Sequence, residues 1–459
     1  MKKNTVLITF YLFCCTCLYG QWDSLGNGIK GGKKYQPIFV VTQAVYNGNL
    51  YFGGIGYDTV GNIPDSNMAT WKGTNWNASG NLKIQGFILS YIVYNGNLIV
   101  GGLIDSIGGI AAKGVAAWNG TSWLRMDSGL GPNGFEVEAM AVYNGNLYIG
   151  GVGELTLYGG YNIEMWNGAK WNAVGLGVYN KPYDSKRKTG GAIFAMDVYD
   201  GKLYVGGKFD SAGNVATNNM AAWDGSNWSA VGVGVMDSTM DAFTVYNNEL
   251  YAGGYLGPWS HSLGVIYKFN GTSWSPVGTG LTGSGFNGSE VNALTVYNSV
   301  VCVAGGFDTI GGVAANHIAY WNGTNWGTFG NGIYGNVYTL GVYNSELFAG
   351  GTFKYAGNVF ANNVAVWSGP VGIPVISTSN STSILPNPNN GKFTISINNF
   401  SEKTNIEIYN VLGEMVYSAK LNSTNTQIEM GNNSAGVYLY RVLNEKSDLI
   451  SEGKFIIQK

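Results

Sequence analysis

Charged side chains and histidines are scarce in this 459-residue chain. Charged residues make up 11% of it, the formal net charge is -2, and there are 2 histidines. A protein that neutralises nucleic-acid phosphates needs a marked excess of Lys and Arg, so nucleic acid is excluded as an expected partner. Two histidines also leave little material for a histidine-rich metal centre. No cofactor, metal site or catalytic residue is predicted.

Cysteines and long apolar runs are scarce as well. Cys14, Cys15 and Cys17 lie in the first twenty residues, which leaves Cys302 alone and no intramolecular disulfide in the mature chain. Two lysines followed by a short apolar run predict a secretory signal peptide over residues 1–20. No Leu-small-small-Cys box favours a lipoprotein anchor instead. No later stretch has the ~20 apolar residues of a membrane span, so no transmembrane anchor is expected.

Glycine and tyrosine are abundant and occur in a repeated pattern. The chain has 71 Gly and 30 Tyr, and the stretch AVYNGNLYFGG at residues 44–54 recurs with small changes. Its tyrosine returns at intervals of 46 to 56 residues, a period typical of β-propeller repeats. The seven copies of this tyrosine are Tyr46, Tyr94, Tyr143, Tyr199, Tyr246, Tyr297 and Tyr343.

Each repeat predicts four antiparallel strands. An alternating strand ends in Tyr, an Asn-Gly-like turn leads to a second strand with a glycine pair, and a third strand ends in Trp. A second tight turn then leads to a fourth strand that begins with Trp. Four antiparallel strands are the content of one propeller blade. The fourth-strand tryptophans are Trp22, Trp76, Trp123, Trp171, Trp228, Trp274 and Trp326.

The two ends of the array predict a closed ring. Trp22 precedes the first copy of the first strand, and the last repeat stops near Gly369 without a fourth strand. If the N-terminal strand joins the last blade, the ring closes and no long edge stays unpaired. We therefore expect an all-β protein with a seven-bladed β-propeller over residues 21–369, closed by a split blade. An open solenoid would need dissimilar caps, and none is visible.

The glycine pairs and tryptophans resemble kelch-type blades. The phrase Trp-Asn-Gly-Thr-x-Trp is also similar to the propeller repeats of fungal cortical marker proteins, as at residues 321–326. The resemblance covers roughly residues 21–369 and implies an architecture, not an activity.

The composition changes after residue 369. Residues 370–383 are a linker of small and polar residues, and residues 384–459 predict a small all-β domain of Ig-like sandwich type. This tail resembles the type A sorting domain of the type IX secretion system of Bacteroidetes. The resemblance rests on LPNPNNGKF at 385–393, YNVLGEMVY at 409–417, GVYLYRV at 436–442 and GKFII at 453–457. It implies contact with that secretion machinery and a secreted or outer-surface location. The alternative is an ordinary C-terminal β-domain.

The strand order predicts two unequal faces of the propeller. The first-to-second and third-to-fourth turns, which are tight, share one face, the turn face. The second-to-third and inter-blade connections share the other, the loop face, where binding residues are expected. Segments 153–160, 255–262 and 179–188 break the repeat on the loop face. The predicted ligand contacts are Glu154, Tyr158, Lys181, Arg187, Trp259 and His261. Drifted loops without a ligand are the alternative.

Three functions stay open at this point. The favoured one is a surface or secreted module that binds a glycan or protein through the loop face. The second is a carbohydrate-active hydrolase or lyase with a carboxylate pair in the channel, because spacing in sequence does not fix spacing in space. The third is a scaffold or adhesion component. Enzyme activity is uncertain and not favoured: His317 takes an Asn position of the repeat, and Cys302 takes a strand position that favours a buried thiol.

Repeated Asp-Ser/Thr-aliphatic triplets resemble the O-glycosylation acceptor motif of Bacteroidetes. The predicted acceptors are Ser24, Thr59, Ser106, Ser211 and Thr309. The alternative is structural, because an Asp at the head of a glycine-containing turn accepts backbone hydrogen bonds.

Overall fold

The structure is a computed structural model of the chain. It describes residues 20–31, 37–64, 67–77, 83–130, 135–153, 161–181, 189–232, 238–257, 263–278, 280–283, 288–369, 382–397, 404–410, 414–431, 433–444 and 449–458. The chain divides into two compact units, Met1–Val371 and Gly372–Lys459. All regular elements of the described residues are β-strands and none is a helix, which confirms the all-β class. The predicted signal peptide and most of the predicted linker lie outside the described residues.

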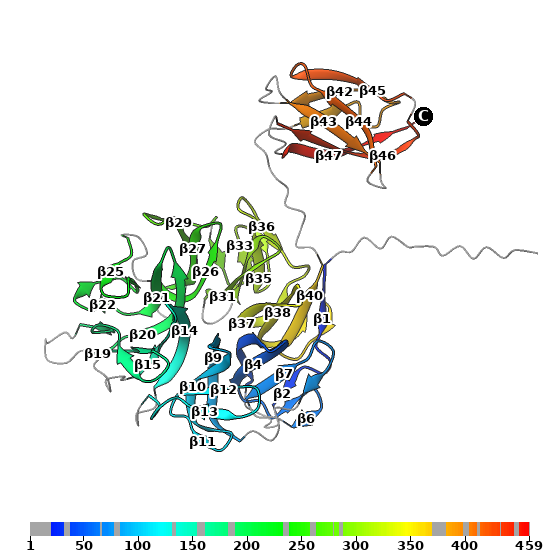
Figure 1. Cartoon of the computed structure of the whole chain (residues 1–459). Coiled ribbons are helices and arrows are strands. Elements are labelled where there is room, and N and C mark those ends of the chain that lie inside the picture. The colour runs from blue at the N-terminus through cyan, green and yellow to red at the C-terminus, as the bar shows by residue number, and fades with distance from the viewer. Residues whose placement is uncertain are drawn as a thin grey trace, which may run out of the picture. The chain divides into compact units, whose positions relative to one another are not determined.

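The described part of the first unit contains seven groups of four antiparallel strands (Figure 1). In chain order they are sheet 1 (β3 Phe39–Tyr46, β4 Asn49–Ile55, β7 Met68–Trp71, β8 Trp76–Asn77), sheet 2 (β9 Ile84–Tyr94, β10 Asn97–Ile107, β12 Val115–Trp118, β13 Trp123–Arg125), sheet 3 (β14 Glu136–Tyr143, β15 Asn146–Val152, β16 Ile163–Trp166, β17 Trp171–Ala173), sheet 4 (β20 Ala192–Tyr199, β21 Lys202–Lys208, β24 Met220–Trp223, β25 Trp228–Ala230), sheet 5 (β26 Ser238–Tyr246, β27 Glu249–Leu256, β28 Leu263–Phe269, β29 Trp274–Pro276), sheet 6 (β31 Glu290–Tyr297, β32 Val300–Gly306, β35 Ile318–Trp321, β36 Trp326–Thr328) and sheet 7 (β37 Ile333–Tyr343, β38 Glu346–Ala356, β40 Val364–Ser368, β1 Gln21–Ser24). One further bridge, Val152 to Ala192, joins sheets 3 and 4.

The N-terminal strand β1 is the fourth strand of sheet 7, as the sequence predicts. β1 pairs antiparallel with β40, with Trp22 opposite Trp367. Trp22 is 4% exposed, and its indole Nε1 donates a hydrogen bond of 2.9 Å to the carbonyl oxygen of Phe329 in the chain that follows sheet 6. Burying this indole and pairing its N–H together anchor the N-terminus to the end of the array.

The first strands of the seven sheets contact one another in cyclic order. The contacts run β3, β9, β14, β20, β26, β31, β37 and back to β3, and Figure 1 shows the sheets following one another around a common centre. The tyrosine that ends each first strand links neighbouring sheets. Tyr46 donates to the carbonyl oxygen of Gly96 in the next hairpin turn at 3.0 Å. Tyr343 of sheet 7 donates to Gly48 of sheet 1 at 2.9 Å.

The glycine pair is required by close approach on both sides in six of the seven second strands; in sheet 6 the first position is Ala304 and the second is Gly305. A Cβ at Gly54 would overlap the carbonyl oxygen of Phe39 in the paired strand, and a Cβ at Gly53 would overlap the Ile88 side chain of sheet 2. The first glycine therefore leaves room for a side chain of the next sheet. The second leaves room for the backbone of the paired strand at a bulge. Equivalent second glycines are Gly102, Gly151, Gly207, Gly254, Gly305 and Gly351, and equivalent first glycines are Gly101, Gly150, Gly206, Gly253 and Gly350.

The loop face is more regular than the sequence predicts. Five second-to-third connections are short hairpins, and three inter-sheet segments pair with them as added strands. These elements are β2 (Ile29–Lys30), β5 (Thr59–Val60), β6 (Ile63–Pro64), β11 (Ile110–Ala111), β18 (Val178–Asn180), β19 (Thr189–Gly190), β22 (Ser211–Ala212), β23 (Val215–Ala216), β30 (Leu281–Thr282), β33 (Thr309–Ile310), β34 (Val313–Ala314) and β39 (Val359–Phe360). The expectation of loops at these places was wrong, because strands of two or three residues are too short to show alternation.

The second unit has two antiparallel sheets that share one core. Their strand orders are β41 (Thr382–Leu385), β42 (Lys392–Ile397), β45 (Asn425–Glu429), and β44 (Met415–Lys420), β43 (Asn405–Tyr409), β46 (Gly436–Leu443), β47 (Leu449–Ile457). Phe393 of the first sheet and Phe455 of the second meet in this core, with ring centroids 4.6 Å apart.

Candidate functional site

Most of the predicted ligand contacts cannot be placed. Glu154, Tyr158, Arg187, Trp259 and His261 lie outside the described residues. Lys181 is described and exposed. Its backbone N–H donates to the carboxylate of Asp210, at 2.9 Å to Oδ1 and 3.0 Å to Oδ2. This places Lys181 on the loop face beside sheet 4, where the sequence predicts ligand contact.

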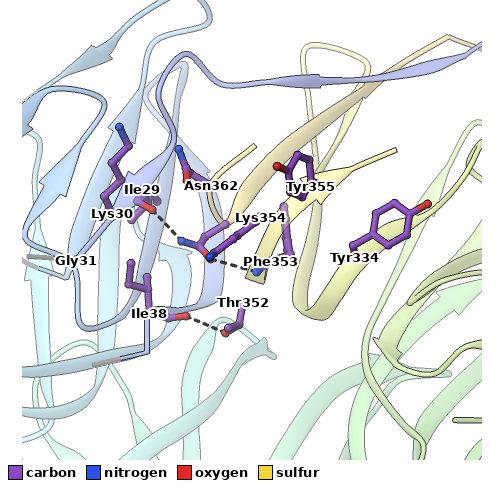
Figure 2. Close-up of a pocket in the computed structure, with 11 residues that line it drawn as sticks. Ile29, Lys30, Gly31, Ile38, Tyr334, Thr352, Phe353, Lys354, Tyr355 and Asn362 are labelled. Atoms are coloured by element: carbon purple, nitrogen blue, oxygen red, sulfur yellow. Dashed lines mark hydrogen bonds between the residues drawn. The ribbon is translucent and has the colours of Figure 1, made fainter. Parts of the chain in front are cut away.

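A cavity of ≈ 650 Å³ opens on the loop face between sheet 7 and sheet 1 (Figure 2). Its walls come from β2, from Ile38 before β3, from the start of β37, from the end of β38 and from the turn between β39 and β40. The size lies within the range of small-molecule sites. The lining residues are Ile29, Lys30, Gly31, Ile38, Tyr334, Thr352, Phe353, Lys354, Tyr355, Asn362 and Asn363.

The base of this cavity is held by Asn363, which adopts a positive φ of 71°. Its Oδ1 accepts the backbone N–H of Phe353 at 3.1 Å, and its Nδ2 donates to the carbonyl oxygen of Ile29 at 2.9 Å. The Thr352 hydroxyl donates to the carbonyl of Ile38 at 2.8 Å, and Figure 2 shows these bonds as dashed lines. Asn tolerates the left-handed region better than most residues. These bonds join β2, β38 and the entry to β3 into one fixed wall.

Exposed aromatic side chains line or adjoin the cavity: Tyr334 and Tyr355 belong to its lining, and Phe360 contacts Tyr355. Tyr334 is 52% exposed, Tyr355 46% and Phe360 52%. Tyr355 and Phe360 touch edge to face, with ring centroids 5.4 Å apart. Large exposed aromatic rings grouped at a cavity present flat apolar faces together with hydroxyl groups. This arrangement suits a ligand that has both apolar faces and hydrogen-bonding groups.

The charge of the cavity is positive. Lys30 and Lys354 belong to its lining, whereas no Asp or Glu is among the described residues that line it. Lys354 is exposed and Lys30 half-buried. Ammonium groups form strong charge-assisted hydrogen bonds with carboxylates and other oxyanions.

A second cluster lies along the first strands, where all seven pairings contain a bulge at the same position of the repeat. The bulged residue is half-buried in all seven sheets, and the residues before and after it are buried. Because the first strands surround the common centre, this pattern directs the seven bulged side chains to a solvent-accessible axis. They are Val41, Leu89, Glu138, Phe194, Asp241, Asn292 and Tyr338.

Carboxylates gather in the polar part of this axial set. Burial, followed by the charges of Glu290 and Glu138, raises the pKa of Asp241 to about 8. Burial, followed by the charge of Glu136, raises the pKa of Glu138 to about 7. Asn292 Nδ2 donates to Glu290 Oε1 at 3.1 Å. Sequence reasoning missed these residues because they lie on strands. The residue type at the bulge position nevertheless differs between repeats that are otherwise alike.

His317 and Cys302 occupy the positions that the sequence predicts, an Asn position of the repeat and a buried strand position. His317 has a positive φ of 68° at the repeat position of Asn363, and its Nδ1 lies 3.2 Å from the carbonyl oxygen of Gly305. Burial lowers the pKa of His317, and burial raises the pKa of the fully buried Cys302 thiol. Among the described residues, no group of three or more His, Cys, Asp or Glu side chains could hold a metal ion.

The predicted glycosylation acceptors differ in accessibility. Ser24, Thr59, Ser106 and Thr309 are half-buried. Ser211 is fully buried, and its hydroxyl donates to Asp210 Oδ1 at 2.8 Å, so a transferase cannot reach it in the folded protein. Modification of the other four stays a prediction.

Residues 383–458 match the family described as the Secretion system C-terminal sorting domain. The match confirms the sorting domain predicted from the tail motifs. The protein is therefore a type IX cargo, secreted or located at the outer cell surface, and its tail implies interaction with the type IX machinery. In the part of the chain that the structure describes, no helix has the length and apolar character of a membrane span.

Among the solved structures that resemble this chain are PorZ and two extracellular domains of B. thetaiotaomicron proteins. PorZ of Porphyromonas gingivalis, described as an essential surface component of its type IX secretion system, is 15% identical, with a TM-score of 0.45 over 94% of this chain and 60% of PorZ. The extracellular domain of BT3049 from B. thetaiotaomicron, described as part of a hybrid two-component system, is 9% identical, with a TM-score of 0.46 over 92% of this chain and 55% of that domain. The corresponding domain of BT4673 from B. thetaiotaomicron is 10% identical, with a TM-score of 0.47 over 88% of this chain and 47% of that domain.

The chain thus spans between about half and three fifths of the length of these three proteins. All three TM-scores are below 0.5, so no function is transferred from them. The comparison with curated proteins gives no match. The family match covers the tail alone, so the kelch-like repeat type stays a prediction.

Proposed function

We propose that this exported protein binds an acidic saccharide in the cavity between sheets 7 and 1, on a seven-bladed β-propeller. The propeller is supported by the seven four-stranded groups, the cyclic contacts of their first strands and the pairing of β1 with β40. Such closure removes the exposed sheet edges that invite aggregation. For the tail, two antiparallel sheets around one core support an Ig-like sandwich.

The proposed ligand class rests on the combination of tyrosine rings and lysine side chains around one cavity. Tyr334 and Tyr355 offer flat faces on which a sugar ring can stack. Lys30 and Lys354 offer ammonium groups to a carboxylate or sulfate, and no lining carboxylate opposes them among the described residues. A uronic acid or sulfated sugar satisfies both features in one ligand, whereas an apolar ligand would leave the lysines without partners.

The test is retention of the mature protein in gels that contain polygalacturonate, alginate or hyaluronan. We expect retention by at least one of these polymers, weaker at high salt because exposed charges are screened. Methyl-esterified polygalacturonate, which has the same backbone without the charge, should retain less. Tyr355→Ala should abolish retention and Lys354→Ala should weaken it. Lys202→Ala, an exposed lysine on the turn face, is the matched control. No retention by any of the three polymers would contradict the proposal.

A second function, cleavage of a saccharide, is favoured by the axial carboxylates. With its pKa raised to about 8, Asp241 holds a proton at neutral pH beside the charge of Glu290, the relation that glycosidases use between acid and base. The check is release of reducing ends from the retained polymer. Asp241→Asn should abolish it, and Asp197→Asn, at another half-buried carboxyl whose pKa is raised by burial, should not. Equal release by both variants would remove this function.

The export route gives two further proposals. The mature extracellular chain is expected to end within or near residues 369–383, after removal of the sorting domain. Ser24, Thr59, Ser106 and Thr309 are expected to carry sugars in native secreted material. Intact mass and peptide mass spectra check both. A retained Lys459 in periplasmic protein would contradict the first, and unmodified masses at all four residues would contradict the second.

A further inference from the structure

The cavity between sheets 7 and 1 has a counterpart between sheets 4 and 5. This second cavity measures ≈ 340 Å³ and also lies on the loop face. On the second strand its lining starts directly after Gly206-Gly207, the pair that is equivalent to Gly350-Gly351 of sheet 7. Its lining residues are Asn180, Lys208, Phe209, Asp210, Thr217, Asn218, Asn219, Thr239, Tyr255 and Gly257.

The two cavities are built on the same framework. Phe209 occupies the repeat position of Phe353, and both are buried, at 1% and 3% exposure. The Asn219 side chain accepts the backbone N–H of Phe209 at 2.9 Å, as Asn363 does from Phe353 at 3.1 Å. Asn219 also has a positive φ, of 60°. The repeat therefore builds one wall of both cavities from the same Asn and Phe positions.

The two cavities differ in chemistry because the side chains at equivalent positions differ. Asp210 stands at the position of Lys354, and Ser211 at the position of Tyr355. The Asp210 carboxylate already accepts the backbone N–H of Lys181 and the hydroxyl of Ser211. Lys208 supplies one positive charge, so the second cavity has one lysine and one engaged carboxylate where the first has two lysines.

The remaining polar groups are either fixed in the framework or have hydrogen-bonding capacity left for a ligand. Asn180 belongs to the framework: its Oδ1 accepts the backbone N–H of Asp210 at 3.1 Å, and its Nδ2 donates to Gly190 at 3.3 Å. Asn218 is exposed and forms no side-chain hydrogen bond with another described residue. Tyr255 is half-buried, and its side chain hydrogen-bonds Thr239. The amide of Asn218 and the Tyr255 hydroxyl can each donate to and accept from a hydroxyl group.

We propose that the cavity between sheets 4 and 5 binds one neutral sugar residue, which gives the protein two saccharide sites of different charge preference. This proposal rests on the proposed function, because it assigns a second sugar class to the same loop face. The volume lies at the lower end of small-molecule sites and suits one ring rather than a chain. Two sites on one rigid unit would hold a polymer more tightly than either site alone.

The test uses methyl glycosides of glucose, galactose and mannose as probes, followed by saturation-transfer NMR with the mature protein at neutral pH. We expect transfer to at least one of them. The double variant Asn218→Ala/Tyr255→Phe should reduce that transfer at least tenfold, whereas Tyr355→Ala in the first cavity should leave it unchanged. Both sets of changes lie at partly or fully exposed side chains, and circular dichroism verifies that each variant is folded.

The outcomes separate this proposal from the proposed function. Loss of transfer in the double variant with retention on acidic polymers intact supports two sites. Loss of transfer in Tyr355→Ala alone overturns the proposal, since one cavity would then bind both probes. Transfer to none of the three glycosides also overturns it, whatever the acidic polymers show. Transfer that depends on Asn218 and Tyr255, without retention on any acidic polymer, supports the second site and contradicts the first.

Discussion

The turn face and the loop face are opposite ends of the same strands, yet they differ in how far the repeats diverge. On the turn face, six of the seven first-strand tyrosines donate to the second residue of the next hairpin turn, and Tyr297 donates to Gly369 instead. On the loop face, equivalent positions hold Lys354 and Asp210, or Tyr355 and Ser211. Repetition persists where a side chain joins two sheets. It is lost where the backbone is already fixed and the side chain meets solvent.

The largest expected effect tests how the ring is held at its junction. Deletion of residues 21–28 from the mature chain removes β1, the buried Trp22 indole and its bond to Phe329. We expect the free energy of unfolding to fall by more than about 5 kcal/mol, because a Trp core deletion alone costs about 3–5 kcal/mol. Thermal unfolding measures this. An unchanged melting temperature would show that the ring does not depend on β1.

The next effect tests the glycine pair. Gly351→Ala places a Cβ against the carbonyl oxygen of Asn336, so the paired strands must separate at the bulge. We expect a loss on the order of 3 kcal/mol, at the upper end of overpacking costs. Gly280→Ala is the control, because a Cβ there meets no atom within 4 Å. Equal melting temperatures of the two variants would contradict the role assigned to the second glycine.

A smaller effect concerns the axis. Because the folded-state pKa of Asp241 is about 8 and an unfolded Asp has a pKa of about 3.9, the folded state binds more protons in this interval. Stability should therefore fall as the pH rises from 4 to 8. Asp241→Asn should flatten this dependence and raise stability at pH 8 by on the order of 1–3 kcal/mol, a discounted value because the side chain keeps contact with solvent. Melting temperatures at pH 5 and pH 8 decide it. A slope unchanged by the substitution would show that Asp241 is ionised in the folded protein.

The smallest effect concerns one hydrogen bond of the turn face. Tyr343→Phe removes the bond to Gly48 that joins sheet 7 to sheet 1. We expect a loss of about 1 kcal/mol, the usual net value of such a bond. Chemical denaturation with Tyr417→Phe in the tail as control measures it. A loss no greater than that of the control would show that this bond adds nothing to closure.

Much of the framework could be predicted from the sequence. The position of Trp22 before the first repeat, together with the missing fourth strand after Trp367, predicts the pairing that β1 and β40 form. The tail motifs likewise predict the sorting domain that residues 383–458 match. Both succeed because the signal is repeated or because several short motifs occur in order.

The candidate sites could not be predicted in the same way. One extra residue in each first strand reverses the direction of the side chains that follow, so alternation alone does not place Glu138 or Asp241 at the axis. The hairpin β38–β39 contains only two residue pairs, too few for a periodic signal in the sequence. The cavity of Figure 2 joins β2 to β38, which are some three hundred residues apart in sequence and adjacent only after the ring closes. The change of residue type at the bulge position from repeat to repeat is the one signal that could have revealed the axial residues.

The most direct test of this account measures retention on polygalacturonate, alginate and hyaluronan together with the melting temperature for wild type and Tyr355→Ala. The account predicts that Tyr355→Ala loses retention and keeps its stability within about 0.5 kcal/mol of wild type, as expected of an exposed side chain. Unchanged retention, or retention lost only together with stability, would contradict the assignment of saccharide binding to the cavity between sheets 7 and 1.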